Sequence, residues 1–366
     1  RGRGRRPLHP DHALHRGPLR PPGPARLLVA VGETSGDRLA GAVVEALRER
    51  RPLHARGVIG DAGAAVGVRP LASLEGLHAV GLVDGLRAAS TALRHRRRLV
   101  EEARRWRPDL LLTVDAPSFT LRAARAVRAL GVPVVHIGAP QVWAWRSGRR
   151  RRLGLAVDEL LCLLPFEPDW FSGHVAARYV GHPATARACV PRASRPTLAL
   201  LPGSRPAEVR RLWPTLRAVA ARVAQAEPGV RLVAVQAPGV QLTGLACGIV
   251  SSVDAVADAW AALATSGTVT LELAALGIPQ VVVYRTDPLT YAVGRRVLSV
   301  PYIALPNLVA DAPVVPEAVQ ALDPDALATQ VCAALRGPRP APLDLRGAAS
   351  VTTMADAVEA WLPREQ

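Results

Sequence analysis

Largely apolar runs alternate with amphipathic stretches along most of this chain. The runs RLLVAV (26–31), DLLLTVDAP (109–117) and VPVVHIGAP (132–140) are rich in leucine and β-branched residues, and the first two precede segments with helical periodicity. Runs of this kind are typical of strands buried on both faces, as in parallel sheets that helices cover. The pattern therefore predicts repeated strand–helix–strand units.

A second set of such units follows a proline-rich segment. Its strands are predicted at 196–204, 230–238 and 278–284, with a helix from about 268 to 276 before the last strand. The segment 181–196 has little periodicity and is interpreted as an interdomain linker. The sequence thus predicts an α/β fold of two doubly wound, Rossmann-like domains that face a cleft, where ligands bind beyond the carboxyl ends of the strands.

The predicted organisation has four parts. They are a disordered basic leader (1–24), an N-terminal domain (25–185), a C-terminal domain (186–340) and a C-terminal helical segment (341–366) that packs back on the N-terminal domain. The leader has no apolar core, which argues against a secretory signal.

Composition excludes several classes of protein. A chain of 366 residues with 49% hydrophobic content buries a large core and is not disordered. The net charge of +16 rests on arginine, and with 4% aromatic residues and no RNA-binding signature, nucleic-acid binding is the weaker interpretation of the basic stretches. The four cysteines form no C-x-x-C pair, so we expect neither a disulfide framework nor a zinc site, and a reducing cytoplasmic environment.

One nearly uncharged stretch, 259–284, has the length of a membrane span. It contains a single charged residue, but Ser266, Gly267, Gly277 and Pro279 interrupt it. We therefore expect strand, turn and helix here and not a span.

The turn VAVGETSGD (29–37) has the glycines of a phosphate-binding loop, with a helix predicted to start near Arg38. It also carries Glu33 and Asp37, whose carboxylates would repel an anion. A different ligand is therefore expected at this turn.

The residues that follow two other predicted strands are suited to bind an anion. Gly203, Ser204 and Arg205 follow the run LALLP, where glycine admits a close ligand and arginine offers a cationic fork; the alternative is an ordinary capped turn. The segment ATSGTVTLE places a second helix start at a strand end, with a carboxylate one turn later that suits ribose hydroxyls; its residues are Ser266, Gly267, Thr268 and Glu272. Together these strand ends favour a nucleotide-sugar site, and the P-loop motif is absent from the sequence.

The motifs GETSGD, TVDAPSF, APQVWAWR, LLPFEPDWF, YVGHP, LALLPGSRPAEV, ATSGTVTLE and ALPNLVAD stand in one order along the chain. From about Arg26 to Leu335 the chain resembles the lipid-A-disaccharide synthase family. The resemblance implies an inverting GT-B glycosyltransferase that needs no metal or cofactor. Its members join UDP-2,3-diacylglucosamine to 2,3-diacylglucosamine 1-phosphate, which forms a β(1→6) disaccharide and releases UDP.

The resemblance also implies roles for residues. The N-terminal domain would hold the acyl-sugar acceptor through Glu33, Ser35, Gly36, Asp37, Gln141 and Trp143. The C-terminal domain would hold the donor through the two strand ends named above together with Asn307. Asp115, in the DAP motif, would be the catalytic base.

Each role has an alternative. In the alternative interpretation Asp37 is only a helix cap and Glu33 is an exposed side chain. Likewise, Asp115 only starts a turn, and Asn307 only stabilises a turn. His136 and His182 are interpreted as structural residues.

Departures from the family pattern leave a different activity open. The chain has Ser118 and Thr120 where many relatives have an acidic and an amide residue. The alternatives are a GT-B enzyme with another UDP-sugar or acyl acceptor, and a noncatalytic relative. Because the expected substrates are acylated, we expect peripheral contact with the anionic cytoplasmic face of the inner membrane through the apolar stretch 74–86 and the arginines of 94–98 and 145–152.

Overall fold

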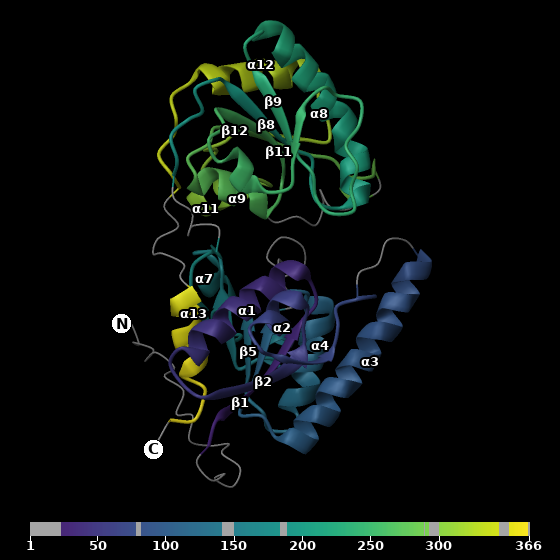
Figure 1. The fold of residues 1–366 in the computed structure, drawn as a ribbon, viewed down its shortest axis with the longest axis vertical. Helices are drawn as coiled ribbons and strands as arrows, with labels where there is room; N and C mark the ends of the chain where they lie inside the picture. Colours follow the sequence, from purple (N-terminus) through teal and green to yellow (C-terminus); the bar gives the residue numbers. More distant parts are fainter. Residues whose placement is uncertain are drawn as a thin grey trace, which may run out of the picture.

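The computed structural model describes residues 23–77, 82–140, 150–183, 189–288, 290–292, 300–343 and 351–364. Within them the chain forms two parallel sheets of seven and six strands, and helices cover both sheets (Figure 1). The α/β class predicted from the alternating pattern is confirmed.

The first sheet has the strand order β3-β2-β1-β4-β5-β6-β7, with every neighbouring pair parallel. The chain winds outward from β1 in one direction and from β4 in the other, as in doubly wound folds. Its strands are β1 (Ala25–Val31), β2 (Leu53–Val58), β3 (Arg69–Ala72), β4 (Leu110–Val114), β5 (Val134–Ile137), β6 (Glu159–Cys162) and β7 (Ala176–Tyr179). Its helices are α1 (Thr34–Arg48), α2 (Asp61–Ala65), α3 (Leu82–Trp106), α4 (Pro117–Arg128), α6 (Arg150–Gly154) and α7 (Glu167–Phe171).

The second sheet repeats this winding in the order β10-β9-β8-β11-β12-β13. Its strands are β8 (Thr197–Leu201), β9 (Arg231–Val235), β10 (Gly248–Val250), β11 (Ala261–Thr265), β12 (Gln280–Tyr284) and β13 (Glu317–Val319). The elements around it are α8 (Pro206–Ala226), the 3-10 helix η4 (Val253–Val256), α9 (Thr268–Ala275), α11 (Leu305–Ala310) and α12 (Pro324–Arg336).

The predicted strands lie where the apolar runs place them. All five residues of β4, β8 and β11 are buried, because helices pack on both faces of each sheet. The predicted helix near 268–276 is confirmed as α9. The nearly uncharged stretch 259–284 folds as β11, α9 and β12. Among the described residues no helix has both the length and the apolar content needed to cross a bilayer.

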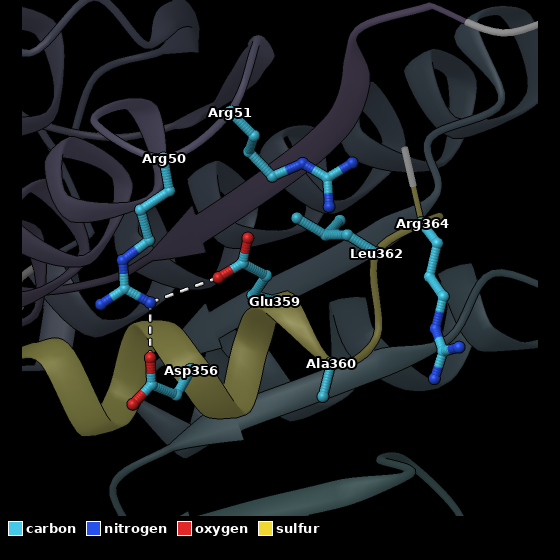
Figure 2. A pocket seen from close by; sticks show the side chains of 7 residues that line it. All are labelled: Arg50, Arg51, Asp356, Glu359, Ala360, Leu362 and Arg364. Atoms are coloured by element: carbon cyan, nitrogen blue, oxygen red, sulfur yellow. Dashed lines mark hydrogen bonds and ion pairs between the residues drawn. The ribbon is translucent and has the colours of Figure 1, made fainter. Parts of the chain in front are cut away.

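The last helix, α13 (Val351–Glu359), returns to the first domain and packs on α1 (Figure 1). Met354, Ala355 and Val358 are fully buried in the apolar cluster that also contains Leu27 and Leu47. At its surface Arg50 pairs with Asp356 at 2.5 Å and with Glu359 at 3.2 Å, beside a hollow that Arg51 and Arg364 also line (Figure 2). This hollow lies at the opposite end of α1 from Glu33, so it is remote from the predicted ligand turn.

A hydrogen bond to a buried glutamate holds the segment after α13 against β6. The indole Nε1 of Trp361 donates to Glu159 Oε2 at 2.5 Å, and Glu159 is 7% exposed and also paired with Arg178. We expect Trp361→Phe to lower the free energy of unfolding by about 1–2 kcal/mol, because a buried carboxylate loses a donor. Asp356→Asn is the control and should have little effect, since its ion pair is exposed. The free energies of unfolding are measured by urea denaturation. Equal losses in the two variants would contradict a stabilising role for the hydrogen bond between Trp361 and Glu159.

The two domains meet through loops at the carboxyl ends of their strands. Leu164, which follows β6, is packed in one apolar cluster with Leu271 of α9 and Leu305 of α11, and Phe166 and Trp170 flank them. The contact therefore joins the segment after β6 to α9, the helix that follows β11.

Candidate active site

The predicted site residues follow the two pairs of strands at which the chain order reverses. In the first sheet β1 leads to Glu33 and its neighbour β4 leads to Asp115. In the second sheet β8 leads to Gly203, and its neighbour β11 leads to Ser266. Such reversal points are where doubly wound sheets bind ligands, since the connecting helices diverge there and leave the strand ends open. Topology therefore brings the predicted residues together in two groups.

Asp115 and Ala116 form a strained turn directly after β4. Both have left-handed backbones, with φ of 47° and 45°, although neither is glycine. The amide of Asp115 donates to the Ile137 carbonyl at 3.0 Å, which fixes the turn to β5. A pair of such residues costs on the order of 1–3 kcal/mol each and is typical of functional sites. The turn thus holds the Asp115 carboxylate in a defined place at the strand end.

Two glycines lie close to Asp115. A Cβ atom added at Gly138 would press on Asp115 Oδ1 and lie 3.3 Å from Cγ, and Gly138 itself has φ of 91°. A Cβ at Gly36 would lie 3.7 Å from Asp115 Cβ and 3.3 Å from the Val114 carbonyl oxygen. Gly36 was predicted to bind acceptor, whereas Gly138 was missed; its signal was a glycine that directly follows the apolar run VVHI.

The carboxyl group of Asp115 is unusually basic. Burial, and to a lesser extent the nearby charge of Glu33, together raise its pKa from 3.8 to about 6. Glu33 is itself exposed, with an extended backbone just before α1. A carboxylate with a pKa near the working pH is suited to accept a proton and release it again.

This coupling gives a prediction for the pH dependence of turnover. Asp115 accepts a proton only when ionised, so kcat/KM should rise with pH through about 6. Glu33→Gln removes the second cause of the raised pKa, and we expect the midpoint to move toward acid by less than about one unit, since burial remains. Glu45→Gln, on the exposed side of α1, is the control and should leave the midpoint unchanged.

An unmoved midpoint in Glu33→Gln would show that Glu33 does not influence the base. A midpoint that moves toward alkaline pH would contradict the sign of the coupling. The measurement is a profile of kcat/KM between about pH 4.5 and 8.5, a range wide enough to contain the expected midpoint.

Thr120, one of the two departures from the family pattern, supports the strained turn. Its hydroxyl donates to the carbonyl of Asp115 at 2.5 Å and to that of Ala116 at 3.0 Å, and its side chain is fully buried. Ser118 is exposed. Thr120 therefore holds the base in position and does not face a ligand.

The side chain of Asp37 makes structural hydrogen bonds, whereas the sequence analysis predicted that it contacts a ligand. Its side chain is 2% exposed, Oδ1 accepts the amide of Gly60 at 2.8 Å, and Oδ2 accepts that of Ala62 at 2.9 Å. The carboxylate thus caps α2, because α2 begins beside the first turn of α1. The predicted helix start near Arg38 is also wrong, since α1 begins at Thr34. Ser35 is exposed in that first turn.

In the second domain Arg205 is exposed at the N-cap of α8, a helix of 21 residues. Ser204 is exposed beside it, and Gly203 has φ of 106°, which favours glycine. The first amides of a helix carry partial positive charge. The guanidinium and the helix end are therefore placed as an anion site requires.

The neighbouring helix α9 starts at the second strand end. Gly267 is its N-cap and Thr268 its exposed first residue, whereas the hydroxyl of Ser266 donates to the Ile303 carbonyl at 2.8 Å. Glu272 lies on the same helix, one turn after Thr268, and is partly buried. Gly267 and Thr268 are thus available to a ligand, and Ser266 joins this strand end to the segment before α11.

Asn307 is fully buried. Its Oδ1 accepts the amide of Val315 at 2.8 Å, and its Nδ2 donates to the Val315 carbonyl at 2.9 Å and to Glu317 Oε2 at 3.2 Å. Both polar atoms are thus engaged within the protein. The structure supports the alternative, in which Asn307 shapes the loop after α11, and it does not support the predicted donor contact.

The remaining predicted residues divide into two groups. Gln141 and Trp143 lie outside the described residues. His136 is fully buried with Nδ1 2.7 Å from Thr113 Oγ1, and burial lowers the pKa of both His136 and His182 to about 4. Both rings are therefore neutral at physiological pH, as expected of structural histidines.

Within the described ranges, no group of three or more His, Cys, Asp and Glu side chains is arranged to hold a metal ion.

Solved structures share this architecture. The glycotransferase of kitacinnamycin aligns over 93% of this chain and 100% of its own with a TM-score of 0.63 and 16% identity. The UDP-GlcNAc 2-epimerase of Methanocaldococcus jannaschii, in complex with UDP-GlcNAc and UDP, aligns over 92% and 99% with a TM-score of 0.61 and 11% identity. At these identities the likeness concerns the fold, which is the GT-B architecture of glycosyltransferases and related epimerases.

Sequence comparison identifies a family within this fold class. The lipid-A-disaccharide synthetase family model matches residues 27–335. The lipid-A-disaccharide synthase of Myxococcus xanthus is 38% identical over 334 residues, which is 84% of this chain and 87% of that protein. That of Alkalilimnicola ehrlichii is 39% identical over 333 residues, with coverages of 83% and 87%. The chain belongs to the lipid-A-disaccharide synthase family.

Proposed function

We propose that this protein transfers a 2,3-diacylglucosaminyl group from UDP to the 6-hydroxyl of 2,3-diacylglucosamine 1-phosphate. The observation that carries the proposal is the pairing of reversal points: a basic carboxylate follows β4 in one domain, and an arginine with a helix end follows β8 in the other. Family membership supports the choice of substrates. The products are the β(1→6) disaccharide and UDP.

The proposed step is a single displacement. The acceptor's hydroxyl oxygen forms the new bond to C1 of the donor sugar while the bond from C1 to the UDP oxygen breaks on the opposite face, which inverts the anomeric centre. The hydroxyl proton passes to the carboxylate of Asp115. The leaving diphosphate keeps the electron pair, and its charge is stabilised by the Arg205 guanidinium and by the positive N-terminal ends of the α8 and α9 dipoles.

We propose that this stabilisation replaces a metal ion. The test is a turnover assay with the purified chain and both acylated substrates, in which UDP and disaccharide are quantified with and without excess chelator. Disaccharide formation that persists in chelator is the expected result. UDP release without disaccharide would contradict the acceptor assignment, and loss of turnover in chelator would contradict the metal-free step.

We further propose that the protein acts at the anionic cytoplasmic face of the inner membrane. Acylated substrates reside in bilayers, and α3 exposes Arg94, Arg97 and Arg98 beside Leu93, which is 40% exposed. In flotation with vesicles, binding should be strong with anionic lipid and weak with zwitterionic lipid, and replacing the three arginines with glutamine should abolish the difference. Equal binding to both vesicle types would contradict the electrostatic contact.

A further inference from the structure

The donor side of the site contains a carboxylate that the proposed function does not use. Glu208, in the first turn of α8, has its carboxylate directly beside the backbone of Gly203. Gly203 belongs to the 203–205 loop that is expected to receive the diphosphate. In the protein without donor, an anionic side chain therefore already occupies the place suited to an anion.

Gly203 shows how closely this carboxylate is held. A Cβ added at Gly203 would lie 2.8 Å from Glu208 Cδ and 3.0 Å from Cγ, so any larger residue would expel the side chain. The left-handed backbone of Gly203, with φ of 106°, turns the loop toward the carboxylate.

We propose that Glu208 is an internal substitute for the donor's phosphate, which holds the 203–205 loop in place and is displaced when the diphosphate binds. The Glu208 carboxylate fills the space beside Gly203, so it and a phosphate group cannot both lie there. Two anions cannot share the pocket without strong repulsion. A ligand with less charge than a diphosphate competes poorly, and Glu208 thereby selects for a nucleoside diphosphate donor. This inference rests on the proposed donor site.

The alternative is that Glu208 is a cap that stays in place and orients Arg205. The two roles predict opposite effects of Glu208→Gln, which keeps the size of the side chain and an oxygen acceptor but removes the charge. A neutral amide does not repel a phosphate group, so a diphosphate should displace the glutamine side chain of Glu208→Gln more easily than it displaces the carboxylate. A permanent Glu208 that orients Arg205 would instead bind phosphate less well after the change.

Glu167 provides a matched control. It is a buried glutamate at the start of α7 whose Oε2 accepts two consecutive amides, those of Leu163 at 3.2 Å and Leu164 at 3.0 Å. Like Glu208, it is thus a glutamate in the first turn of a helix, but in the other domain. Glu167→Gln shows how far removing the charge of a glutamate at a helix start changes UDP affinity in general. Thermal unfolding of both variants tests whether each is folded.

The experiment is calorimetric titration of the full chain with UDP and with uridine, which lacks phosphate. Glu208→Gln should bind UDP about 5- to 20-fold more tightly than wild type, by the difference between a charged and a neutral acceptor. Its affinity for uridine and the UDP affinity of Glu167→Gln should stay within about twofold of wild type. If Glu208→Gln does not fold, Glu208→Asp takes its place, since the shorter side chain does not fill the space beside Gly203, and tighter UDP binding is again expected.

The outcomes separate this inference from the proposed function. Tighter UDP binding by Glu208→Gln, including the case in which only this variant binds UDP, supports the displaced carboxylate. Unchanged or weaker UDP binding by Glu208→Gln, with wild type binding UDP, overturns the inference and leaves the donor site in place. If neither protein binds UDP, both the donor site and the inference fail.

Discussion

Asp115→Asn is expected to lower kcat by about a thousandfold, because a positioned general base contributes roughly 10²- to 10⁴-fold. Asparagine is the suitable replacement, since it tolerates the left-handed backbone that Asp115 has, with φ of 47°. The affinity for UDP should not change, because the donor groups belong to the other domain. Turnover of both acylated substrates and titration with UDP provide the two measurements.

The same change should stabilise the protein at neutral pH. The pKa of Asp115 is raised from 3.8 to about 6 in the folded state, so the native protein binds more protons between these values and loses stability as pH rises through them. Removing the charge should therefore raise the free energy of unfolding by about 1–3 kcal/mol at pH 7.5 and by little near pH 4. Asp109→Asn, at the other end of β4, provides the control, since Asp109 Oδ2 accepts the amide of Arg26 at 2.7 Å.

Loss of turnover combined with gained stability is the signature of a functional carboxylate held in an unfavourable place. A structural aspartate such as Asp109 should behave in the opposite way, with turnover retained and stability lost. An Asp115→Asn enzyme with wild-type kcat would exclude Asp115 as the base, whatever its effect on stability.

The sheets were predictable because each buried strand is a continuous apolar run followed by polar residues. Once the strands are known, the order of a doubly wound sheet places the residues after β1, β4, β8 and β11 at the reversal points. Much of the candidate site therefore follows from local pattern and a general rule of topology. The strand end that carries Arg205 was proposed in this way, whereas the role predicted for Asp115 came from the family resemblance.

The polar contacts between elements were not predictable from local pattern. Asp37 was interpreted as facing a ligand because nothing near it in sequence shows that α2 begins beside its carboxylate. Asn307 was interpreted as a donor contact, yet its partners Val315 and Glu317 lie eight and ten residues later. Glu208 was overlooked because its contact depends on the backbone of Gly203. Side-chain hydrogen bonding depends on the three-dimensional packing of turns, which periodicity does not describe.

Gly138→Ala is expected to lower kcat about a hundredfold. The added methyl group would press on Asp115 Oδ1 and lie 3.3 Å from Cγ, so the carboxylate must rotate away from its present position. Displacing a catalytic group by about 1 Å can cost on the order of 10²-fold in rate. The base itself remains, so the expected defect lies in kcat while the affinity for UDP is retained.

Gly131→Ala separates this displacement from backbone strain. Gly131 has φ of 82°, close to the 91° of Gly138, but a Cβ there would meet no atom within 4 Å. Both variants should lose about 1 kcal/mol of stability, since alanine is unfavourable in this backbone region. Only Gly138→Ala should lose turnover, because only its methyl group contacts Asp115. A similar loss of kcat in both variants would attribute the defect to strain and would contradict the placement of the base by Gly138.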